Sequence, residues 1–525
     1  MPASSTLPND VATLKRLVVE RDREIEHLKL QLARLRRWKF GASSEAIERA
    51  GQMPLTLEEL QDVVAWHVQQ SATDEASAAG ESRGTEAKNR PVRRQRLPEH
   101  FERDENVIEP AESACAECGG ELKKLGEPDA SEVLEAKTVT FTVTRHIRPK
   151  KRCCKCARIV QAPAPSRPIE KSFAGASLLA LILTWKYGFH LPLYRQCQIF
   201  AHAGLTISRT TLMQWVGASS ELLGPLVQAL SRYVLSAGNV NGDDTPVKVL
   251  APGMGKTKKG YLWTYVRDGR PWKSPDPPAA WYQYSPGRAG AYPQRHLKSY
   301  AGTLQVDGYA GFEALFAAPA PNVPARITEV GCWAHVRRGF FDLHEATSSP
   351  TAKDALDRIG SLYGIEEAIR GEPAEVRLAV RQKHAVPLLE ELRAWMVKVR
   401  TEVENGSALA KALNYALNRW EVLSRYTQDG HLEIDNNTAE RSVRGACVGK
   451  KNYLFFGSDS GGERAATAYS LIETCKLNNI DPQRYLQYVL ERIADHPINR
   501  VEELLPWNVA DKLNQPDQVT EALAA

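Results

Sequence analysis

The sequence predicts a multidomain protein of mixed α and β structure. Its 525 residues exceed the roughly 250–300 at which a single hydrophobic core stops growing, so several domains are expected. Strand patterns and helical patterns alternate in blocks along the second half of the chain, which is typical of an α/β domain. The stretch 1–165 instead contains a heptad repeat, a polar stretch and a cysteine cluster.

Composition narrows the class of protein. The amino terminus, "MPASSTLPND", has no basic region followed by an apolar core, so we expect no secretory signal. The longest apolar run, "ASLLALILTW", is shorter than the roughly 18 residues of a membrane span and is predicted to be a buried helix. We therefore expect a soluble, cytoplasmic protein with no membrane partner. Nine cysteines without a secretory signal argue against a disulfide framework.

Residues 1–50 are predicted to form a coiled coil followed by a basic segment. Steps of four and three separate the apolar heptad residues, which suits a helical seam between chains and predicts self-association. A surface helix packed on its own domain remains the alternative. The basic and aromatic stretch "RRWKFGASSE" follows. The heptad residues are Val11, Leu14, Val18, Ile25, Leu28, Leu32 and Leu35, with Arg21 interrupting the seam.

Residues 71–104 are predicted to be a flexible linker. The part "SATDEASAAGESRGTEAKNRPVRR" has almost no large apolar residues and cannot bury enough surface to fold. Its arginine-rich end is either a solvated arm or a nonspecific contact with phosphates.

Residues 105–165 are predicted to form a zinc-ribbon-like module. Cys115 and Cys118 form one CxxC pair, and Cys153 and Cys156 form a second after the intervening stretch 119–152. Four thiolates can close a tetrahedral site around Zn²⁺ and leave no open position, so we expect a structural role. Cys154 could replace Cys153. The intervening "KTVTFTVTRHIRP" alternates as a strand does.

Residues 174–232 are predicted to be helical, with a possible helix-turn-helix. Gly204 permits a turn, and Ser208 can cap the helix that follows. Thr210, Thr211 and Gln214 would then face outward from that helix. Any helical hairpin could produce this pattern, so DNA contact remains one of two interpretations.

Strand patterns return at residue 238 and bring carboxylates with them. "VNGDDTPVKVL" sets Asp243 and Asp244 in an apolar strand, and Asp307 ends a later strand, "GTLQVDGYAGF". A buried carboxylate needs a cation, and separated carboxylates that converge with Glu440 could hold two Mg²⁺ ions. Spacing alone leaves the alternative that Asp307 caps a helix and Glu440 pairs with Arg444.

Several ordered motifs together resemble a known family. "DDTPVKVL", "VDGYAGF", "GCWAHVRRGFFD", "DNNTAERSVRG" and "KKNYLFFGSDSGGERAA" are similar to segments of the transposases of the insertion-sequence-66 family. "RRWKFGASSE", the paired cysteines and the carboxy-terminal "ELLPWN" also resemble that family's segments, so the likeness covers nearly the whole chain.

The resemblance implies a ribonuclease-H-like catalytic core over residues 238–475, with a helical insertion at about 345–430, and a carboxy-terminal helical segment over 476–525. It carries the family's DDE residues onto Asp243, Asp307 and Glu440. The family commonly has Asp-Glu-Thr where this chain has "DDT", which leaves open whether Asp244 assists the metal.

The resemblance also implies an activity. Mg²⁺ or Mn²⁺ held by these carboxylates would cut one strand at each transposon end, and the released 3′ hydroxyl would attack target DNA. The implied partners are double-stranded DNA, a second copy of the chain and accessory proteins of the same element, in a bacterial cytoplasm and at the nucleoid when bound to DNA. For the three candidates in "CWAHVRR", ion pairs on a helix face are the alternative. Candidate DNA contacts are His335, Arg337, Arg338, Arg441, Arg444, Lys450 and Lys451.

Two further functions compete with transposition: a zinc-containing DNA-binding regulator derived from a transposase, and a metal-dependent nuclease without strand transfer. Trp333 is either a core residue or a base-stacking residue, and Phe455 and Phe456 are expected in the core. The recognised end sequence, the target preference and the subunit number cannot be deduced from one sequence.

Overall fold

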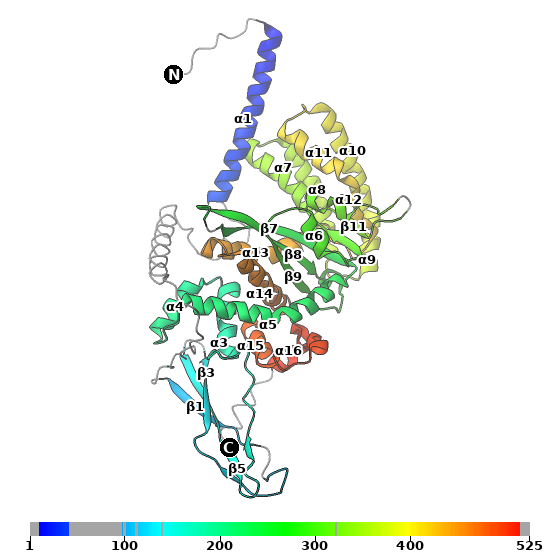
Figure 1. The fold of residues 1–525 in the computed structure, drawn as a ribbon. Helices are drawn as coiled ribbons and strands as arrows, with labels where there is room; N and C mark the ends of the chain where they lie inside the picture. Colours follow the sequence, from blue (N-terminus) through cyan, green and yellow to red (C-terminus); the bar gives the residue numbers. More distant parts are fainter. Residues whose placement is uncertain are drawn as a thin grey trace, which may run out of the picture. The chain divides into compact units, whose positions relative to one another are not determined.

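The computed structural model describes residues 10–40, 97, 101–110, 114–137, 140–251, 253–320 and 323–514. The chain divides into two compact units, which we describe separately. The first contains α1 (Val11–Phe40), a single helix of 30 residues (Figure 1). Residues 41–50 of the predicted coiled-coil segment, and 71–96 of the predicted linker, lie outside the described residues. Within this unit, exposed heptad side chains include Val11, Val18, Ile25, Leu28 and Leu32.

The second unit begins with two small sheets. One has the order β1-β4-β3, with β1 parallel to β4, and the other has the antiparallel order β2-β5-β6. The strand predicted between the cysteine pairs is β4, in the first sheet. The strands are β1 (Glu102–Val107), β2 (Leu122–Lys124), β3 (Asp129–Lys137), β4 (Thr140–Arg148), β5 (Lys150–Cys153) and β6 (Ile159–Gln161).

The end of the predicted linker, 71–104, is strand and not linker. Leu97 and Phe101 are buried, and β1 begins at Glu102. The Phe101 ring lies 5.7 Å from the ring of Phe141 on β4, so an apolar anchor ends the polar stretch earlier than composition suggested.

A helical segment follows, as expected for residues 174–232. Ser208 caps α5 by accepting a hydrogen bond from the Thr211 amide at 3.0 Å, and Gly204 turns the chain with a φ of +84°. Thr210 and Gln214 are exposed, so a helix-turn-helix remains a prediction with suitable geometry. The elements are α3 (Ala176–Leu183), η2 (Thr184–Gly188), α4 (Leu193–His202) and α5 (Arg209–Leu235).

A five-stranded sheet forms the centre of the second unit. Its order is β11-β10-β7-β8-β9, in which β7, β8 and β9 are antiparallel while β10 and β11 run parallel to β7. Trp263 and Tyr265 of β8 are fully buried, and Trp263 and its neighbour Thr264 face opposite sides, so both faces of the sheet are covered. The strands are β7 (Asn239–Ala251), β8 (Lys256–Arg267), β9 (Ala279–Ser285), β10 (Gly302–Gln305) and β11 (Ile327–Val330).

Different helices cover the two faces of this sheet. Helices α13 and α14 pack against β7, β8 and β9 (Figure 1), and the Tyr282 hydroxyl of β9 donates to the Ser442 carbonyl of α13 at 2.7 Å. On the other face Trp263 packs edge-on against Phe312 at 5.7 Å. Besides η3 (Arg270–Trp272), the elements are α6 (Ala291–His296), η4 (Ala310–Leu315), α13 (Asn437–Tyr453), α14 (Asp459–Leu477), α15 (Pro482–Arg492), η7 (Ile498–Leu504) and α16 (Pro506–Asn514).

Helices fill the interval between β11 and α13. They begin at Trp333, and Trp333 and Phe340 pack into a second hydrophobic core formed mainly by these helices. No helix among the described residues is long and apolar enough to cross a membrane. The elements are α7 (Trp333–Thr347), α8 (Pro350–Ile369), α9 (Ala374–Val380), η5 (Arg381–Ala385), α10 (Val386–Glu402), α11 (Ala408–Asn418), α12 (Trp420–Ser424) and η6 (Arg425–Gln428).

Candidate functional site

The register between β7 and β10 brings Asp243 and Asp307 to adjacent strands. The two strands are parallel, and Gln305 pairs with Asn241. Asp243 comes two positions after Asn241 on β7, and Asp307 comes two positions after Gln305, just beyond the end of β10. Two carboxylates that are distant in sequence are therefore brought near each other where β10 ends beside β7.

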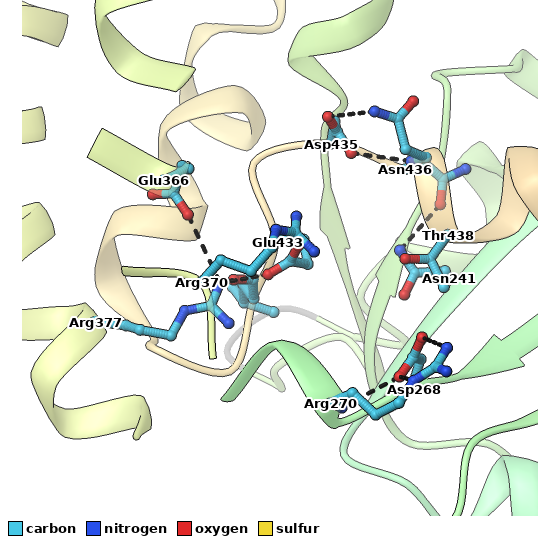
Figure 2. Close-up of polar contacts among 12 residues, drawn as sticks. Asn241, Asp268, Arg270, Glu366, Arg370, Arg377, Glu433, Asp435, Asn436 and Thr438 are labelled. Carbon is cyan, nitrogen blue, oxygen red and sulfur yellow. Dashed lines mark hydrogen bonds and ion pairs between the residues drawn. The ribbon is translucent and has the colours of Figure 1, made fainter. Parts of the chain in front are cut away.

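A hydrogen-bond network fixes the third carboxylate beside them. Glu440 lies in the first turn of α13, and Asn436 immediately precedes that helix. The Asn436 Nδ2 atom donates to the Gly242 carbonyl at 2.8 Å, and the Asn241 Nδ2 atom donates to Asn436 Oδ1 at 3.1 Å (Figure 2). The start of α13 is thereby held next to the residue that precedes Asp243.

The electrostatics of Asp243 reflect this convergence. Burial first, and then the neighbouring charges of Asp307, Asp244 and Glu440, raise the pKa of Asp243 to about 8, against a backbone hydrogen bond from the Asp244 amide. The pKa is high because the charged form lacks both water and a cation. A bound cation would remove this penalty.

Asp244 has a different cation. Adjacent strand residues face opposite sides of a sheet, so Asp244 points away from Asp243. Arg288 binds it with Nε 2.9 Å from Oδ2 and Nη2 2.9 Å from Oδ1, and its guanidinium lies 3.7 Å from the centre of the Tyr309 ring. The Asp244 side chain is only 2% exposed. Arg288 was not predicted as a functional residue; it forms an ion pair with a carboxylate that also contributes to the raised pKa of Asp243.

Glu440 has one carboxylate oxygen without a hydrogen bond. Arg338 Nη2 lies 3.2 Å from Oε2, whereas Oε1 is buried with no hydrogen-bond donor among the described residues. The closest cationic candidate for Oε1 is His335 Nδ1 at 3.6 Å, and burial lowers the pKa of His335, so the imidazole is neutral near pH 7. The ion pair with Arg444 is not formed; both neighbours come from α7.

A second group of possible metal ligands overlaps this site. Cys332, His335 and Glu440 offer ligand atoms within 4.8 Å of one another, while the three carboxylates do not meet that criterion together in the described part of the chain. His335 Nδ1 also lies 3.3 Å from the Cys332 sulfur. Asp307 and Glu440 both raise the pKa of Asp243, so the three carboxylates lie near one another, although their oxygens do not all come within 4.8 Å.

The basic residues predicted to contact DNA differ in whether other groups of the protein already bind their side chains. Lys450 donates to Thr245 Oγ1 at 2.7 Å and to the Pro246 carbonyl at 2.8 Å, so it fastens α13 to β7. Arg441 is exposed and donates to Thr438 Oγ1. The remaining exposed candidates are Arg337, Arg338, Arg444 and Lys451.

The aromatic candidates belong to the core. Trp333 is fully buried, and its Nε1 atom donates to the Leu423 carbonyl at 2.8 Å, so base stacking by this residue is excluded. Phe456 is also buried, and Phe455 is half-buried.

Four cysteine sulfurs converge in the small antiparallel sheet. The sulfurs of Cys115, Cys118, Cys153 and Cys156 lie within 4.8 Å of one another, whereas Cys154 is exposed and outside the group. Hydrogen bonds lower the pKa of Cys153 and Cys115, which favours the thiolate, whereas sharing protons with these neighbours raises the pKa of Cys118 and Cys156. Four sulfurs with no oxygen ligand suit Zn²⁺.

Tight turns shape this cysteine cluster. The Gly119 amide donates to the Cys115 carbonyl at 2.8 Å, and the Ala157 amide donates to the Cys153 carbonyl at 3.0 Å. A Cβ atom on Gly120 would lie 2.9 Å from the Cys153 sulfur, so glycine is required for close approach there.

A cavity lies away from the carboxylates. It has a volume of about 580 Å³ and is lined by residues at the opposite ends of β7 and β10, including Asn239 and Thr303. Of its two arginines, Arg267 is paired with Asp276, and Arg326 donates to the Leu297 carbonyl at 3.0 Å, so both already have partners within the protein. We assign no ligand to it.

Four family models match the chain, and relatives resemble it over most of its length. Residues 171–464 match the family model "Transposase IS66 family", 470–507 the "IS66 C-terminal element", 112–157 the "zinc-finger binding domain of transposase IS66" and 27–105 "Transposase C of IS166 homeodomain". Uncharacterized protein y4hP of Sinorhizobium fredii is 40% identical over 494 residues, covering 91% of this chain and 88% of the relative. Uncharacterized protein y4jD of the same organism is 38% identical over 516 residues, covering 97% and 98%.

Proposed function

The chain belongs to the IS66 family of transposases, and from that premise we propose that it cuts the ends of an insertion sequence and joins them to target DNA. The observation that carries the proposal is the convergence of Asp243, Asp307 and Glu440 from β7, the end of β10 and α13. The activity would be metal-dependent strand cleavage followed by strand transfer.

We infer that residues 238–475 form a ribonuclease-H-like catalytic domain. Three antiparallel strands followed by two strands parallel to the first, in the order β11-β10-β7-β8-β9, support this assignment. The helices between β11 and α13 form an insertion, and the distance from Asp307 to Glu440 along the chain follows from it.

Two divalent ions, Mg²⁺ or Mn²⁺, fit the carboxylate set. Asp243, Asp307 and Glu440 offer oxygen ligands, which these ions prefer, and the buried Oε1 atom of Glu440 lacks a hydrogen-bond donor among the described residues. When bound, such ions activate the attacking oxygen and stabilise charge on the leaving oxygen. The high pKa of Asp243 reflects the cost of a charged carboxylate at this position when no cation is bound.

Residues around the carboxylates would position α13 and set the local charge. Asn436 and Asn241 hold α13 against β7, and Arg288 forms an ion pair with Asp244 that would offset part of its charge. Arg338 lies at the exposed side of Glu440 and would contact a phosphate beside the reacting bond. His335, neutral near pH 7, lies 3.6 Å from Glu440 Oε1 and would add no competing positive charge beside it.

The reaction has two displacements at phosphorus. Water attacks the phosphodiester at each transposon end and releases a 3′ hydroxyl; that hydroxyl then attacks a target phosphodiester, and the target's own 3′ oxygen leaves. Neither displacement needs a covalent protein intermediate. Asp243, Asp307 and Glu440 are the catalytic residues of the proposal, and the exposed basic side chains would bind phosphates of the DNA backbone. This set comprises Arg337, Arg338, Arg441, Arg444 and Lys451.

The other modules would serve assembly and recognition. A structural Zn²⁺ would bind Cys115, Cys118, Cys153 and Cys156. The exposed apolar heptad residues of α1 would pair with a second copy of the chain, and helices α4 and α5 would contact DNA as a helix-turn-helix. Accessory proteins of the element would join the active assembly.

A cleavage and joining assay with Glu440→Gln tests the proposal. Labelled DNA carrying the inverted repeats that flank the gene is incubated with Mg²⁺ and either the wild type or the variant. Joined products from the wild type alone support a transposase. Cut but unjoined DNA points to a nuclease, and binding without cleavage, even with accessory proteins, points to a DNA-binding regulator.

A further inference from the structure

We propose that two buried arginines of the helical insertion, Arg377 and Arg381, position the three catalytic carboxylates. They would do so through residues 429–436, which link η6 to α13 and which we call the connector. The inference rests on the proposed function, because it assigns a role to residues that touch neither substrate nor metal. The insertion would then be part of the catalytic apparatus as well as an addition to the fold.

The connector is an irregular segment that is buried over most of its length. Leu432, Glu433, Ile434, Asp435 and Asn436 are at most 6% exposed, although none lies in a helix or strand. Backbone polar groups that are buried without a partner are costly, so such a segment is fixed by whichever groups bind it. Its hydrogen bonds therefore indicate what it connects.

One side of the connector binds the strands that carry the carboxylates. The Glu433 carbonyl accepts a hydrogen bond at 2.7 Å from Gln305 Nε2, two residues before Asp307. The Asn436 side chain binds the Gly242 carbonyl next to Asp243, and Glu440 follows Asn436 by four residues. A shift of the connector would therefore move all three carboxylates relative to one another.

The other side of the connector binds Arg381. This side chain is fully buried at the start of η5. Its Nη1 atom donates to the carbonyls of Tyr426 at 2.9 Å and Asp429 at 3.0 Å, and its Nη2 atom donates to the Leu432 carbonyl at 2.8 Å. Glu366 on α8 holds the guanidinium through Nε at 2.8 Å and Nη2 at 2.6 Å. Arg381 thus joins α8 to both the start and the middle of the connector.

Arg377 makes a second attachment one helical turn earlier. It is 1% exposed, donates to the Leu432 carbonyl at 3.1 Å and forms an ion pair with Glu433. Arg370 binds the other Glu433 oxygen at 2.7 Å (Figure 2). Glu433 is therefore clamped by two arginines of the insertion, while its own carbonyl is bound by β10.

Stability alone is a poor explanation for this cluster. Buried ion pairs are expensive to desolvate, and apolar residues of similar volume often replace them without loss of stability. Arg377 also leaves its Nε and Nη1 atoms buried without a hydrogen bond among the described residues, a further cost. Apolar residues cannot reproduce the planar guanidinium of Arg381, which binds one carbonyl of η6 and two carbonyls of the connector.

The decisive variant removes the buried ion pair between Arg381 and Glu366 by replacing both residues. Arg381→Met with Glu366→Leu replaces both buried charges by apolar side chains, and Arg393→Met changes an exposed arginine of α10 as the matched control. The readouts are the unfolding midpoint, end-DNA binding, Mn²⁺ binding to the DNA-bound protein by electron paramagnetic resonance, and cleavage as a function of Mg²⁺. A merely structural role would change the midpoint but not the metal affinity.

We expect the double variant to remain folded and to keep end binding, with a lowered unfolding midpoint because the carbonyls of Tyr426 and Asp429 lose their donor. Its cleavage should fall on the order of 100-fold at fixed Mg²⁺, since a displacement of about 1 Å has that effect, and its Mn²⁺ affinity should fall about tenfold. Wild-type Mn²⁺ affinity and cleavage in this variant would overturn the proposal.

A second variant covers the case in which the double variant unfolds. Arg381→Lys retains the charge but not the planar fork, and we expect weaker Mn²⁺ binding with a retained fold; wild-type binding would overturn the proposal. If the wild type binds Mn²⁺ but never cuts, the proposed function fails while the comparison of Mn²⁺ affinities still decides the positioning role.

Discussion

Replacing Asn436 tests how α13 is held against the catalytic strand. Its side chain is fully buried, donates to the Gly242 carbonyl at 2.8 Å and accepts from Asn241 at 3.1 Å. Asn436→Ala removes both hydrogen bonds, each worth about 1 kcal/mol, and leaves the buried Gly242 carbonyl unsatisfied at about 1–3 kcal/mol. Allowing for overlap between these terms, we expect a loss of about 2–4 kcal/mol in the free energy of unfolding.

Thermal unfolding checks this magnitude. In a domain of about 150–250 residues, each kcal/mol lowers the midpoint by roughly 2–4 °C, so a fall of about 4–16 °C is expected. Asn452→Ala, at an exposed position near the end of the same helix, is the matched control. A midpoint no lower than that of the control would refute the argument that Asn436 fastens α13. End cleavage should fall as well, because Glu440 lies one turn into the helix.

Three further predictions concern the other modules. The purified protein should contain one Zn²⁺ per chain by metal analysis; Cys153→Ser should lose it and Cys154→Ser should not, and equal loss in both would contradict the cysteine assignment. Removal of residues 1–40 should lower the oligomeric state measured by light scattering, whereas an unchanged mass would show that α1 is not the pairing element. Asp244→Asn should lower the unfolding free energy by about 1–3 kcal/mol; this is less than for a fully buried ion pair, because Arg288 is 38% exposed. The Mn²⁺ affinity of this variant should equal that of the wild type, and weaker Mn²⁺ binding would make Asp244 part of the metal site.

The family and the broad architecture were predictable from sequence. Ordered motifs around Asp243, Asp307 and Glu440 predicted the IS66 family, which the comparisons confirm, and the mixed α/β class and the zinc-finger module are also confirmed. These features are local: a CxxC pair or a strand that ends in aspartate is visible in one short stretch. The roles of individual site residues remain predictions.

Other features depend on contacts between distant segments. The separation of Asp243 and Asp307 along the chain did not show that they are close in space. The pairing of β7 with β10 shows it, because each aspartate follows a paired residue by two positions. Arg288 and Arg381 looked like ordinary arginines, because their partners, Asp244 and the connector, are distant from them in the sequence. The linker boundary was wrong for the same reason, since the anchor of Phe101 is on β4.

The measurement that tests the central claim most directly compares strand cleavage and joining by the wild type and Glu440→Gln. The substrate is labelled DNA with the flanking inverted repeats, in Mg²⁺ and with the element's accessory proteins present. Equal end binding by both proteins, with cut and joined products from the wild type alone, is the predicted result. Cleavage by the variant at the wild-type rate would contradict the assignment of Glu440, and with it the carboxylate site on which the proposed function rests.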